Sequence, residues 1–333
     1  MSDSSENPVF EIAMAYQKTA ALIAAVKLDI FSAIGAETMS LEDLAQRTNA
    51  SVRGLRILCD YLTVIGLLRK QDSRYSLTHI AKTFLDESAP LAVGKIVDFV
   101  AAPEILDLFL SDPASYVRRG GSSGLANVSP DHPVWVRFAK AAVPFAAAAA
   151  KRVAAHVADL PEPPYTVLDI AAGHGLYGIE VAKVLPEVLV TAVDWEQVLT
   201  VTRANAEAAG VADRFRMLAG NALDMDWGSD YDLILLPNFL HHFDFETCTL
   251  LLRKVKDSLA IDGQAWGIDL VPNEDRVSPP VPAMFAFWML ATTPGGDAYT
   301  GRELDKMARK AGFGGAKTQS LAPTPESLIV FER

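Results

Sequence analysis

The stretch Thr166-Val-Leu-Asp-Ile-Ala-Ala-Gly-His-Gly-Leu-Tyr-Gly178 decides the fold of this chain. Its apolar first half predicts a buried strand, and the glycines that follow predict a tight turn into a helix. Residues 173–178 satisfy the G-x-G-x-x-G pattern of dinucleotide sites. That pattern is weak by itself, so the nature of the ligand must come from the residues around it.

Two carboxylates flank this glycine loop. Asp169 lies at the end of the predicted strand, where it would repel a pyrophosphate about 4 Å away by roughly 1 kcal/mol in water and about 4 kcal/mol at a protein surface. A cationic ligand reverses that sign. Asp194 ends the next apolar strand, where a carboxylate can accept both hydroxyls of a ribose. The two acids therefore favour a cationic nucleoside ligand, with helix capping as the plain alternative for each.

Predicted strands alternate with helices beyond residue 165, which is typical of a mostly parallel, doubly wound α/β sheet. After a predicted helix over 301–312, two strands separated by Ala322-Pro-Thr-Pro325 predict an antiparallel pair at the edge of the sheet. The predicted strands cover 166–170, 188–194, 214–219, 231–237, 264–271, 316–321 and 326–332.

The N-terminal part predicts a helical domain with a winged helix-turn-helix. Apolar residues recur at helical spacing from Phe10 to Gly35, so we expect one long helix that needs a partner surface. Ser40 and Ser51 each precede a helical pattern as N-caps, and a short strand pair follows at 66–77. The next residues to 160 are mostly helical, with a glycine-rich loop at 118–124 and a proline-rich linker before the sheet.

Composition and charge disfavour several classes of function. The 333 residues carry 30 basic and 41 acidic side chains, a formal net charge of -11, and the second helix of the winged motif offers only Arg53 and Arg56 to phosphates. Cys59 and Cys248 lie far apart in the sequence with no C-x-x-C spacing, which disfavours a zinc site and a disulfide framework. No run of about 18 apolar residues occurs, and Met1–Pro8 does not resemble an export signal. We expect a cytoplasmic protein without nucleic-acid or membrane partners, and a DNA-binding regulator is the rival hypothesis.

The combination of these features resembles class I S-adenosylmethionine-dependent methyltransferases. D-x-A-x-G-x-G at 169–175 is similar to their motif I, Asp194 to their ribose acid, and Leu240-His-His-Phe-Asp244 follows the fourth strand. The order of winged helix, helical segment and methyltransferase sheet resembles that of the small-molecule O-methyltransferases. This family includes plant caffeate and flavonoid enzymes, acetylserotonin methyltransferase and bacterial polyketide-tailoring enzymes. The resemblance implies a winged-helix dimerisation domain over 1–90, a helical substrate-lining segment and linker over 91–164, and a Rossmann-like catalytic domain over 165–333. It also implies a homodimer.

The same resemblance implies S-adenosyl-L-methionine as methyl donor and S-adenosyl-L-homocysteine as product. Asn221 takes the place of an aspartate in the family's G-D pair and should offer its amide to the adenine. Trp195 should cover the adenine or ribose, with an ordinary core tryptophan as the alternative. The implied cofactor-binding residues are Asp169, Ala171, Gly173, Gly175, Asp194, Trp195, Asn221, Ala222 and Asn238.

A histidine after the fourth strand is the general base that the resemblance implies. His241 matches that position, and a histidine pKa of about 6.5 suits the removal of a proton from an acceptor hydroxyl. His242 stands where relatives carry aspartate and is the alternative base. Metal binding by the two histidines and Asp244 is disfavoured because adjacent side chains diverge on a helix, and Asp244 is alternatively a helix cap. We expect no metal.

Relatives orient the base with two later acids, and this sequence departs from both positions. Asp269 lies one residue out of register with the first acid, and Asp297 is near the second, whose own position is taken by Ala298. These departures leave open the methylation of carbon or nitrogen. They also leave open the pericyclic, hydroxylation or decarboxylation chemistry of some relatives.

An apolar pocket for an aromatic or polyketide-like acceptor is the remaining expectation. Ala142 replaces a methionine that relatives place against the acceptor, which suggests a roomier pocket. Ordinary core packing is the alternative for the large apolar residues. The candidate substrate-binding residues are Phe138, Ala142, Met284, Phe285 and Trp288.

Overall fold

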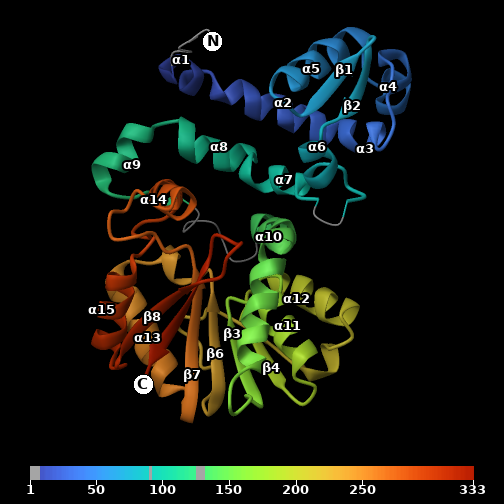
Figure 1. Cartoon of the computed structure of the whole chain (residues 1–333). Coiled ribbons are helices and arrows are strands. Elements are labelled where there is room, and N and C mark those ends of the chain that lie inside the picture. Colours follow the sequence, from blue (N-terminus) through green and yellow to red (C-terminus); the bar gives the residue numbers. More distant parts are fainter. Residues whose placement is uncertain (1–7, 90–91, 125–131) are drawn as a thin grey trace. The chain divides into compact units, whose positions relative to one another are not determined.

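The computed structural model describes residues 8–89, 92–124 and 132–333. The chain divides into two compact units, Met1–Leu106 and Asp107–Arg333, and helix α8 (Pro103–Leu110) crosses the boundary between them (Figure 1). Apart from Pro8, the N-terminal stretch in which we found no export signal lies outside the described residues. None of the helices within the described residues combines the length and hydropathy of a membrane span.

The first unit contains the predicted winged helix-turn-helix. Its elements are α1 (Pro8–Ala13), α2 (Ala15–Lys27), α3 (Ile30–Ile34), α4 (Leu41–Thr48), α5 (Val52–Val64), β1 (Leu68–Gln71), β2 (Arg74–Leu77), α6 (His79–Phe84), η1 (Gly94–Ile96) and α7 (Val97–Val100). The hydroxyls of Ser40 and Ser51 cap α4 and α5 by accepting the N–H groups of Asp43 and Gly54, both at 3.1 Å. β1 and β2 pair antiparallel, and Tyr75 of β2 is fully buried in the core of the unit.

The prediction of one long helix from Phe10 to Gly35 is wrong. The chain forms α1, α2 and α3 over this stretch, with breaks at Met14 and at Asp29. Asp29 has a φ of 52°, a left-handed conformation that a right-handed helix cannot contain. The second break lets the apolar side chains of α3 enter the core, whereas α1 has no buried residue.

The second unit is built on a seven-stranded sheet with the order β5-β4-β3-β6-β7-β9-β8. Its strands are β3 (Thr166–Ile170), β4 (Leu189–Asp194), β5 (Phe215–Ala219), β6 (Tyr231–Pro237), β7 (Leu259–Asp269), β8 (Gly315–Ser320) and β9 (Ser327–Glu332). The strands from β3 to β7 pair in parallel, and β9 and β8 add the predicted antiparallel edge. β7 begins earlier than predicted and has a register shift against β6. The predicted α/β fold class is confirmed.

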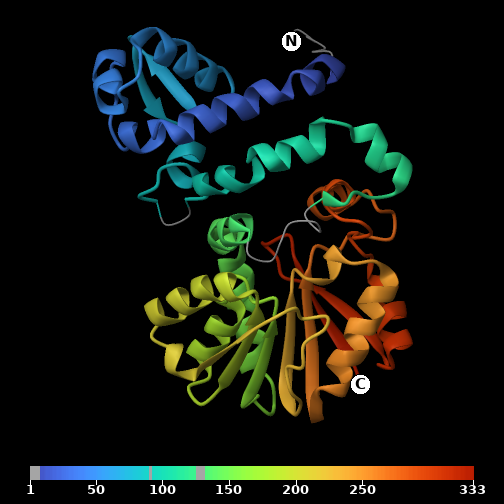
Figure 2. The same cartoon turned by 180° about the vertical axis from the view of Figure 1, so that it is seen from behind.

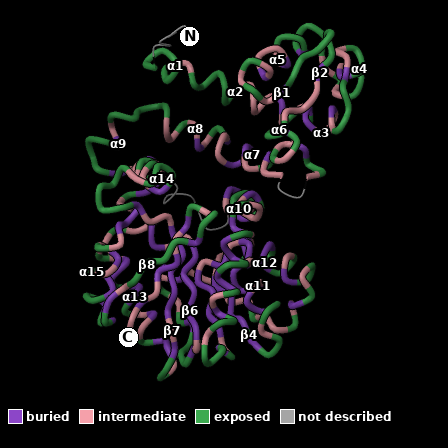
Figure 3. Tube along the Cα trace, in the orientation of Figure 1, coloured by how far each residue is buried: buried purple, intermediate pink, exposed green. Residues whose placement is uncertain are grey.

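Helices cover both faces of this sheet, as Figure 2 shows. The helices of this unit are α9 (Pro113–Arg119), α10 (Pro133–Ala158), α11 (Leu176–Val184), α12 (Glu196–Ala208), α13 (Phe245–Asp257), α14 (Pro280–Thr292) and α15 (Gly301–Ala311), with the short η3 (Ala212–Arg214) and η4 (Leu240–His242). Of these, α9 and α14 lie beyond the strand ends and not on a face of the sheet. α10 and α11 share one apolar core with the sheet, and α13 and α15 share the other. The strands between them are largely buried (Figure 3).

The glycine-rich stretch at 118–124 packs closely against the loop that follows α14. A Cβ at Gly121 would lie 2.2 Å from the carbonyl oxygen of Pro294, and a Cβ at Gly124 would lie 2.2 Å from that of Thr292. Ser122 donates its N–H to the carbonyl oxygen of Thr293 at 2.8 Å. The glycines that predicted a loop here therefore also permit a close approach of two backbones.

The carboxyl ends of the parallel strands meet at one edge of the sheet. β3, β4, β6 and β7 end there, so the residues that follow these strands lie along the same edge although they are far apart in the sequence. Ligands bind at this edge in open α/β sheets.

Candidate active site

Asp169 is the penultimate residue of β3, just before the glycine loop, and is fully buried. Its Oδ2 accepts the N–H of Gly178 at 3.1 Å, whereas its Oδ1 has no hydrogen-bond partner within residues 8–89, 92–124 and 132–333. Burial, with a smaller effect from the charge of Asp194, raises the pKa of Asp169 to about 7. Because an unpaired buried carboxylate oxygen is costly, this strand end fits a ligand that brings a cation or a hydrogen-bond donor.

The glycine loop turns through the left-handed region of backbone conformation. Ala171, Gly173 and Gly175 have φ values of 55°, 59° and 75°. A Cβ at Gly175 would lie 2.5 Å from the side chain of Thr202 in α12, so packing requires glycine there. A Cβ at Gly173 would meet nothing closer than 3.8 Å. Space therefore remains beside Gly173 for a ligand to approach the backbone.

Asp194 ends β4, the neighbour of β3, and ties the loop to that strand. Its two oxygens accept the N–H groups of Gly173 at 2.8 Å and Trp195 at 2.7 Å. Burial raises the pKa of Asp194 to about 6, although both hydrogen bonds lower it. Each carboxylate oxygen can accept a second hydrogen bond, so capacity for two hydroxyls of a ribose remains.

His241 on η4 and Asp269 at the end of β7 form a buried pair. Nδ1 of His241 and Oδ1 of Asp269 are 2.7 Å apart, although Asp269 is out of register in the sequence. We assign the proton to Nδ1 because its partner is a carboxylate, which leaves Nε2 of the neutral ring as an acceptor. The ring of Phe285 in α14 meets the imidazole edge to face, with 4.8 Å between centroids. The imidazole is thus held in one orientation.

His242 lies in a different environment from its neighbour. It is half-buried, its ring centroid is 4.3 Å from that of His241, and no hydrogen bond of its side chain is found within the described residues. Burial and the adjacent His241 hold the pKa of His242 well below its usual value. Asp244 accepts the N–H of Thr247 at 2.8 Å and caps α13. Across the described residues, no three potential metal ligands gather into a metal site.

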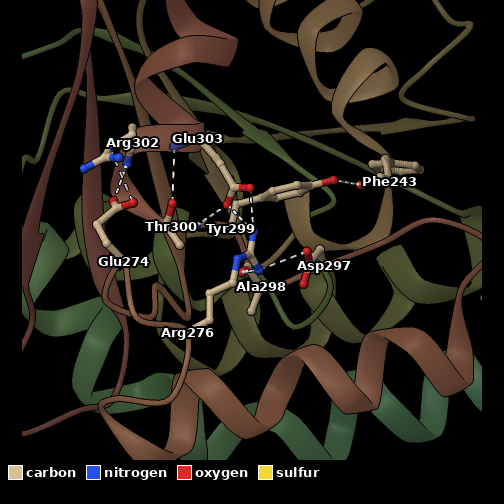
Figure 4. Close-up of polar contacts among 9 residues, drawn as sticks. All are labelled: Phe243, Glu274, Arg276, Asp297, Ala298, Tyr299, Thr300, Arg302 and Glu303. Atoms are coloured by element: carbon tan, nitrogen blue, oxygen red, sulfur yellow. Dashed lines mark hydrogen bonds and ion pairs between the residues drawn. The ribbon is translucent and has the colours of Figure 1, made fainter. Parts of the chain in front are cut away.

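Asp297, near the predicted second orienting acid, pairs with an arginine instead of a histidine. Figure 4 shows Arg276 between two carboxylates, with Nη1 3.1 Å from Asp297 and Nη2 2.5 Å from Glu303. Glu274 and Arg302 form a second pair beside it, at 3.6 Å. These ion pairs fasten the loop after β7 to the segment that leads into α15 and to the first turn of α15 itself.

That segment, residues 294–299, fits closely around the turn that carries the histidines. A Cβ at Gly296 would lie 2.2 Å from the carbonyl oxygen of His241. The hydroxyl of Tyr299 donates to the carbonyl oxygen of Phe243 at 2.6 Å (Figure 4). Ala298, which the sequence resemblance placed where relatives carry an acid, is buried. The segment therefore contacts the backbone of the histidine turn, and it offers the imidazole no carboxylate from Ala298.

The residues predicted to hold the adenosine follow β4, β5 and β6 at one edge of the sheet. Trp195 is half-buried against α10 and α12, and Asn238 directly follows β6 with a φ of 52°. Asn221 donates its amide to Asp224 at 2.6 Å and accepts a backbone N–H, so its side chain holds the turn after β5. Ala222 is buried in the core. The amide of Asn221 would have to be shared with Asp224 to contact a base.

The predicted acceptor-lining residues are divided between α14 and α10. Phe285 contacts the imidazole of the buried pair, and Trp288 packs against an aromatic ring of α8 with centroids 4.9 Å apart. Met284 is 66% exposed. Phe138 and Ala142 lie on α10, the first exposed and the second half-buried. Phe285 is therefore the one candidate whose ring contact with the imidazole of His241 is found among the described residues.

Two buried polar side chains at this edge were missed by the sequence analysis. Tyr177, the second residue of α11, is 1% exposed, and Glu326, directly before β9, is 9% exposed. Among the described residues, Oε2 of Glu326 has no hydrogen-bond partner, whereas the side chain of Asn238 lies beside the hydroxyl of Tyr177 and lowers its pKa against the effect of burial. A signal existed for both, because the tyrosine lies inside the glycine stretch and the glutamate directly precedes an apolar strand. Arg276 and Gly296 gave no signal, since their contacts join distant segments.

Comparison with known proteins assigns the family. The model of the O-methyltransferase dimerisation domain matches residues 10–87, and the model of the O-methyltransferase domain matches residues 129–314. The chain belongs to the O-methyltransferase family. The family is S-adenosylmethionine-dependent, so the predicted family and its class of enzyme are confirmed, and the winged-helix region lies in a dimerisation domain.

The similarity of this O-methyltransferase to its relatives covers nearly its full length. It is 27% identical to 3-hydroxy-5-methyl-1-naphthoate 3-O-methyltransferase of Streptomyces sahachiroi, covering 96% of this chain and 93% of that protein. It is 25% identical to the S-adenosyl-L-methionine-dependent methyl transferase PigF of a Serratia strain, covering 96% and 94%. A crystal structure from Nostoc punctiforme, described as that of an O-methyltransferase, is 45% identical over all of both chains, with a TM-score of 0.93.

Proposed function

We propose that this enzyme methylates a hydroxyl of a small aromatic or polyketide-like acceptor and that His241 is the general base. The observation that carries the proposal is the buried pair of His241 and Asp269, with 2.7 Å between Nδ1 and Oδ1, on the same sheet edge as the glycine loop. The base and the methyl donor then face one acceptor from adjoining strand ends. An acceptor hydroxyl between them would lose its proton as it attacks.

The chain's residues fit S-adenosylmethionine at the glycine loop. Asp169 has a free buried oxygen for a cationic ligand, Asp194 retains capacity for the ribose, and Gly173 leaves space beside the backbone. When bound, the donor supplies a methyl group on a sulfonium centre. The residues proposed to hold it are Asp169, Ala171, Gly173, Gly175, Asp194, Trp195, Asn221, Ala222 and Asn238.

His241 and Asp269 have separate tasks in this proposal. Asp269 keeps the proton on Nδ1, so that Nε2 can take the proton of the acceptor hydroxyl. The same carboxylate then stabilises the imidazolium that forms. Phe285 restrains the ring from one side and lines the acceptor space from α14. His242 is the weaker candidate for the base because its side chain has no orienting carboxylate within the described residues.

The acceptor proposal rests on apolar walls and on the relatives. Phe285 and Trp288 of α14 supply aromatic surface, and we assign Phe138, Ala142 and Met284 to the same wall. The 3-O-methyltransferase of S. sahachiroi acts on a hydroxynaphthoate, a fused aromatic acid with a phenolic hydroxyl. We therefore assign residues 91–164 to lining the acceptor and 165–333 to donor binding and catalysis.

We further propose that residues 1–90 form a homodimer interface. The match to a dimerisation domain and the exposed apolar side chains of Val9, Phe10 and Ile12, each more than 60% exposed, support this assignment. Light scattering after size exclusion should give twice the mass of the chain. A monomer mass at micromolar concentration would contradict it.

Product analysis tests the chemistry. Incubation with S-adenosylmethionine and a panel of hydroxynaphthoates should yield a product heavier by one methylene unit. The matched control is the same panel with the hydroxyl already converted to its methyl ether, which should give no product. Methylation of the ether-blocked panel would indicate transfer to carbon or to the carboxylate, and substrate consumption without the mass gain would indicate a different reaction class.

A further inference from the structure

The turn that carries the two histidines is held only weakly by its own backbone. η4 is a single short turn of 3₁₀ helix, in which hydrogen-bond geometry is poor. The N–H of His242 donates to the carbonyl oxygen of Phe239 at 3.3 Å, and the N–H of Phe243 donates to that of Leu240 at 3.2 Å. Both bonds are longer than the usual value of about 2.9 Å. The position of the turn therefore depends on contacts with other segments.

Two side chains supply such contacts by donating to carbonyl groups on either side of His241. The thiol of Cys248 in α13 donates to the carbonyl oxygen of Leu240 at 3.1 Å. The hydroxyl of Tyr299 donates to the carbonyl oxygen of Phe243 at 2.6 Å (Figure 4). Both donors are buried, so water competes little for the two carbonyls. The turn is thus fixed both before and after its first histidine.

The two donors are themselves firmly placed. Cys248 and Tyr299 lie in one core cluster with apolar residues of α13 and α15. Tyr299 directly precedes Thr300, whose hydroxyl caps α15 while Glu303 accepts the N–H of Thr300 at 2.9 Å. Arg276 binds the same glutamate. Because a helix cap and an ion pair anchor the residues around it, the tyrosine can hold the turn in place.

Both groups stay protonated, as a hydrogen-bond donor must. Burial raises the pKa of Tyr299 above its ordinary value, and burial raises the pKa of Cys248 to about 12. The tyrosine hydroxyl lies beside this thiol and lowers its pKa against the effect of burial. The two hydrogen bonds therefore persist throughout the pH range in which a neutral histidine acts as a base.

Resting on the proposed role of His241 as general base, we infer that Tyr299 is a positioning residue for that base. Its hydroxyl fixes the carbonyl oxygen of Phe243, and the thiol of Cys248 acts in the same way on the carbonyl that precedes the histidine. Asp269 sets the rotation of the imidazole, whereas these two donors set the position of the backbone that carries it. Displacement of a catalytic group by about 1 Å costs up to 100-fold in rate, so a hydroxyl that acts only through the backbone can affect methyl transfer.

A double-mutant cycle of single-turnover rates tests this role. Tyr299→Phe removes the hydroxyl and keeps the ring. The rate of methyl transfer to a hydroxynaphthoate, at saturating donor and acceptor, should fall about fivefold to tenfold, and the affinity for S-adenosylhomocysteine should stay within about twofold of wild type. In the His241→Ala background the same substitution should change the residual rate less than about twofold, because no base remains to be positioned.

Tyr231→Phe is the matched control for the cycle. Tyr231 belongs to the same core cluster, and its buried hydroxyl donates to the Trp227 carbonyl at 2.6 Å, but it lies at the other end of β6 from the histidine turn. Its loss should change the rate less than about twofold in either background. A rate loss in Tyr299→Phe that is equally large without His241 would overturn the positioning role, because a merely structural effect does not need the base.

The two variants of Cys248 provide an independent test. Cys248→Ala removes the donor and should lower the single-turnover rate about threefold, whereas Cys248→Ser retains a donor and should restore most of that loss. Equal losses in the two variants would show that the thiol acts by packing and would overturn its part in the proposal. If Tyr299→Phe does not fold, as judged by circular dichroism, this pair of variants decides.

Proton NMR gives a readout that does not depend on turnover. The hydrogen-bonded Nδ1 proton of His241, identified by its absence in His241→Ala, should shift or broaden in Tyr299→Phe and stay unchanged in Tyr231→Phe. An unchanged resonance in Tyr299→Phe would overturn the inference. If the wild-type protein methylates none of the hydroxynaphthoates, the proposed function fails by itself, and this resonance still decides whether Tyr299 positions the imidazole.

Discussion

The glycine-loop edge and the histidine turn lie along the same end of one sheet, yet their polar groups are satisfied differently. At the loop, one buried carboxylate oxygen of Asp169 and one of Glu326 have no hydrogen-bond partner among the described residues. At the turn, Asp269 pairs with His241, and neighbouring segments fill the space around the backbone. Under the proposed function, a ligand completes the loop edge, whereas the residues of the histidine turn already contact one another. Binding and base positioning should then respond to different substitutions.

The largest expected effect is on turnover at the histidine turn. His241→Ala should lower kcat about 100-fold to 10,000-fold, because the acceptor hydroxyl loses its general base. The measurement is the rate of product formation at saturating donor and acceptor. His242→Ala is the comparison and should lower kcat much less. Equal losses in both variants would remove the distinction between the two histidines.

Gly296→Ala should produce the next largest effect, because it pushes on the same turn from outside. The added methyl would lie 2.2 Å from the His241 carbonyl oxygen, so the turn must move. We expect kcat to fall about tenfold or more, since misplacement of a catalytic group by about 1 Å costs up to 100-fold. Gly301→Ala is the control, because its methyl would meet the Thr318 side chain at ordinary contact distances, 3.4 Å or more. A fully active Gly296→Ala enzyme would show that the turn tolerates displacement.

At the loop edge, Asp169→Asn should stabilise the empty protein. Folding raises the pKa of Asp169 to about 7. As pH rises from about 4 to 7, the unfolded chain loses this proton before the folded chain does, so the free energy of unfolding falls. The penalty is absent below the unfolded pKa of about 4 and complete above the folded pKa. Asparagine removes the penalty and can still accept the N–H of Gly178. Urea unfolding should show the variant about 1–3 kcal/mol more stable at pH 8 and little different at pH 4. Equal differences at both pH values would contradict this cause.

The smallest expected effect comes from the ion pairs that fasten the loop after β7. Arg276 is 40% exposed at its side chain, so Arg276→Gln should cost less than about 1 kcal/mol of unfolding free energy. Its kcat should fall slightly, through looser packing of residues 294–299. Arg302→Gln, whose side chain is 70% exposed, is the control and should change neither quantity measurably. A larger loss in the control would show that the loop is held elsewhere.

The sequence contained the fold because its signals are local. Glycines after β3, acids at strand ends and serine caps each act within a few residues, and the sheet follows from their order. The long N-terminal helix was wrong because the left-handed residue Asp29 interrupts an otherwise continuous apolar pattern.

The sequence predicted those site residues whose type alone indicates their chemistry, and it did not predict the contacts between them. His241 and Asp269 were singled out, but their distance depends on how β6 and β7 lie side by side. Arg276 and Gly296 contact segments that are distant in the sequence, and a pattern in a single sequence does not predict such contacts. Tyr177 and Glu326 were recognised only from their burial in the folded chain, 1% and 9% exposed.

The most direct test of the separation between binding and base positioning is one calorimetric experiment. S-adenosylhomocysteine is titrated into wild-type, His241→Ala and Asp169→Asn protein in the same buffer at pH 8. The account predicts equal affinities, within about twofold, for wild type and His241→Ala, and a loss of about tenfold or more for Asp169→Asn. An absent isotherm for wild type, or a loss in His241→Ala as large as that in Asp169→Asn, would contradict it.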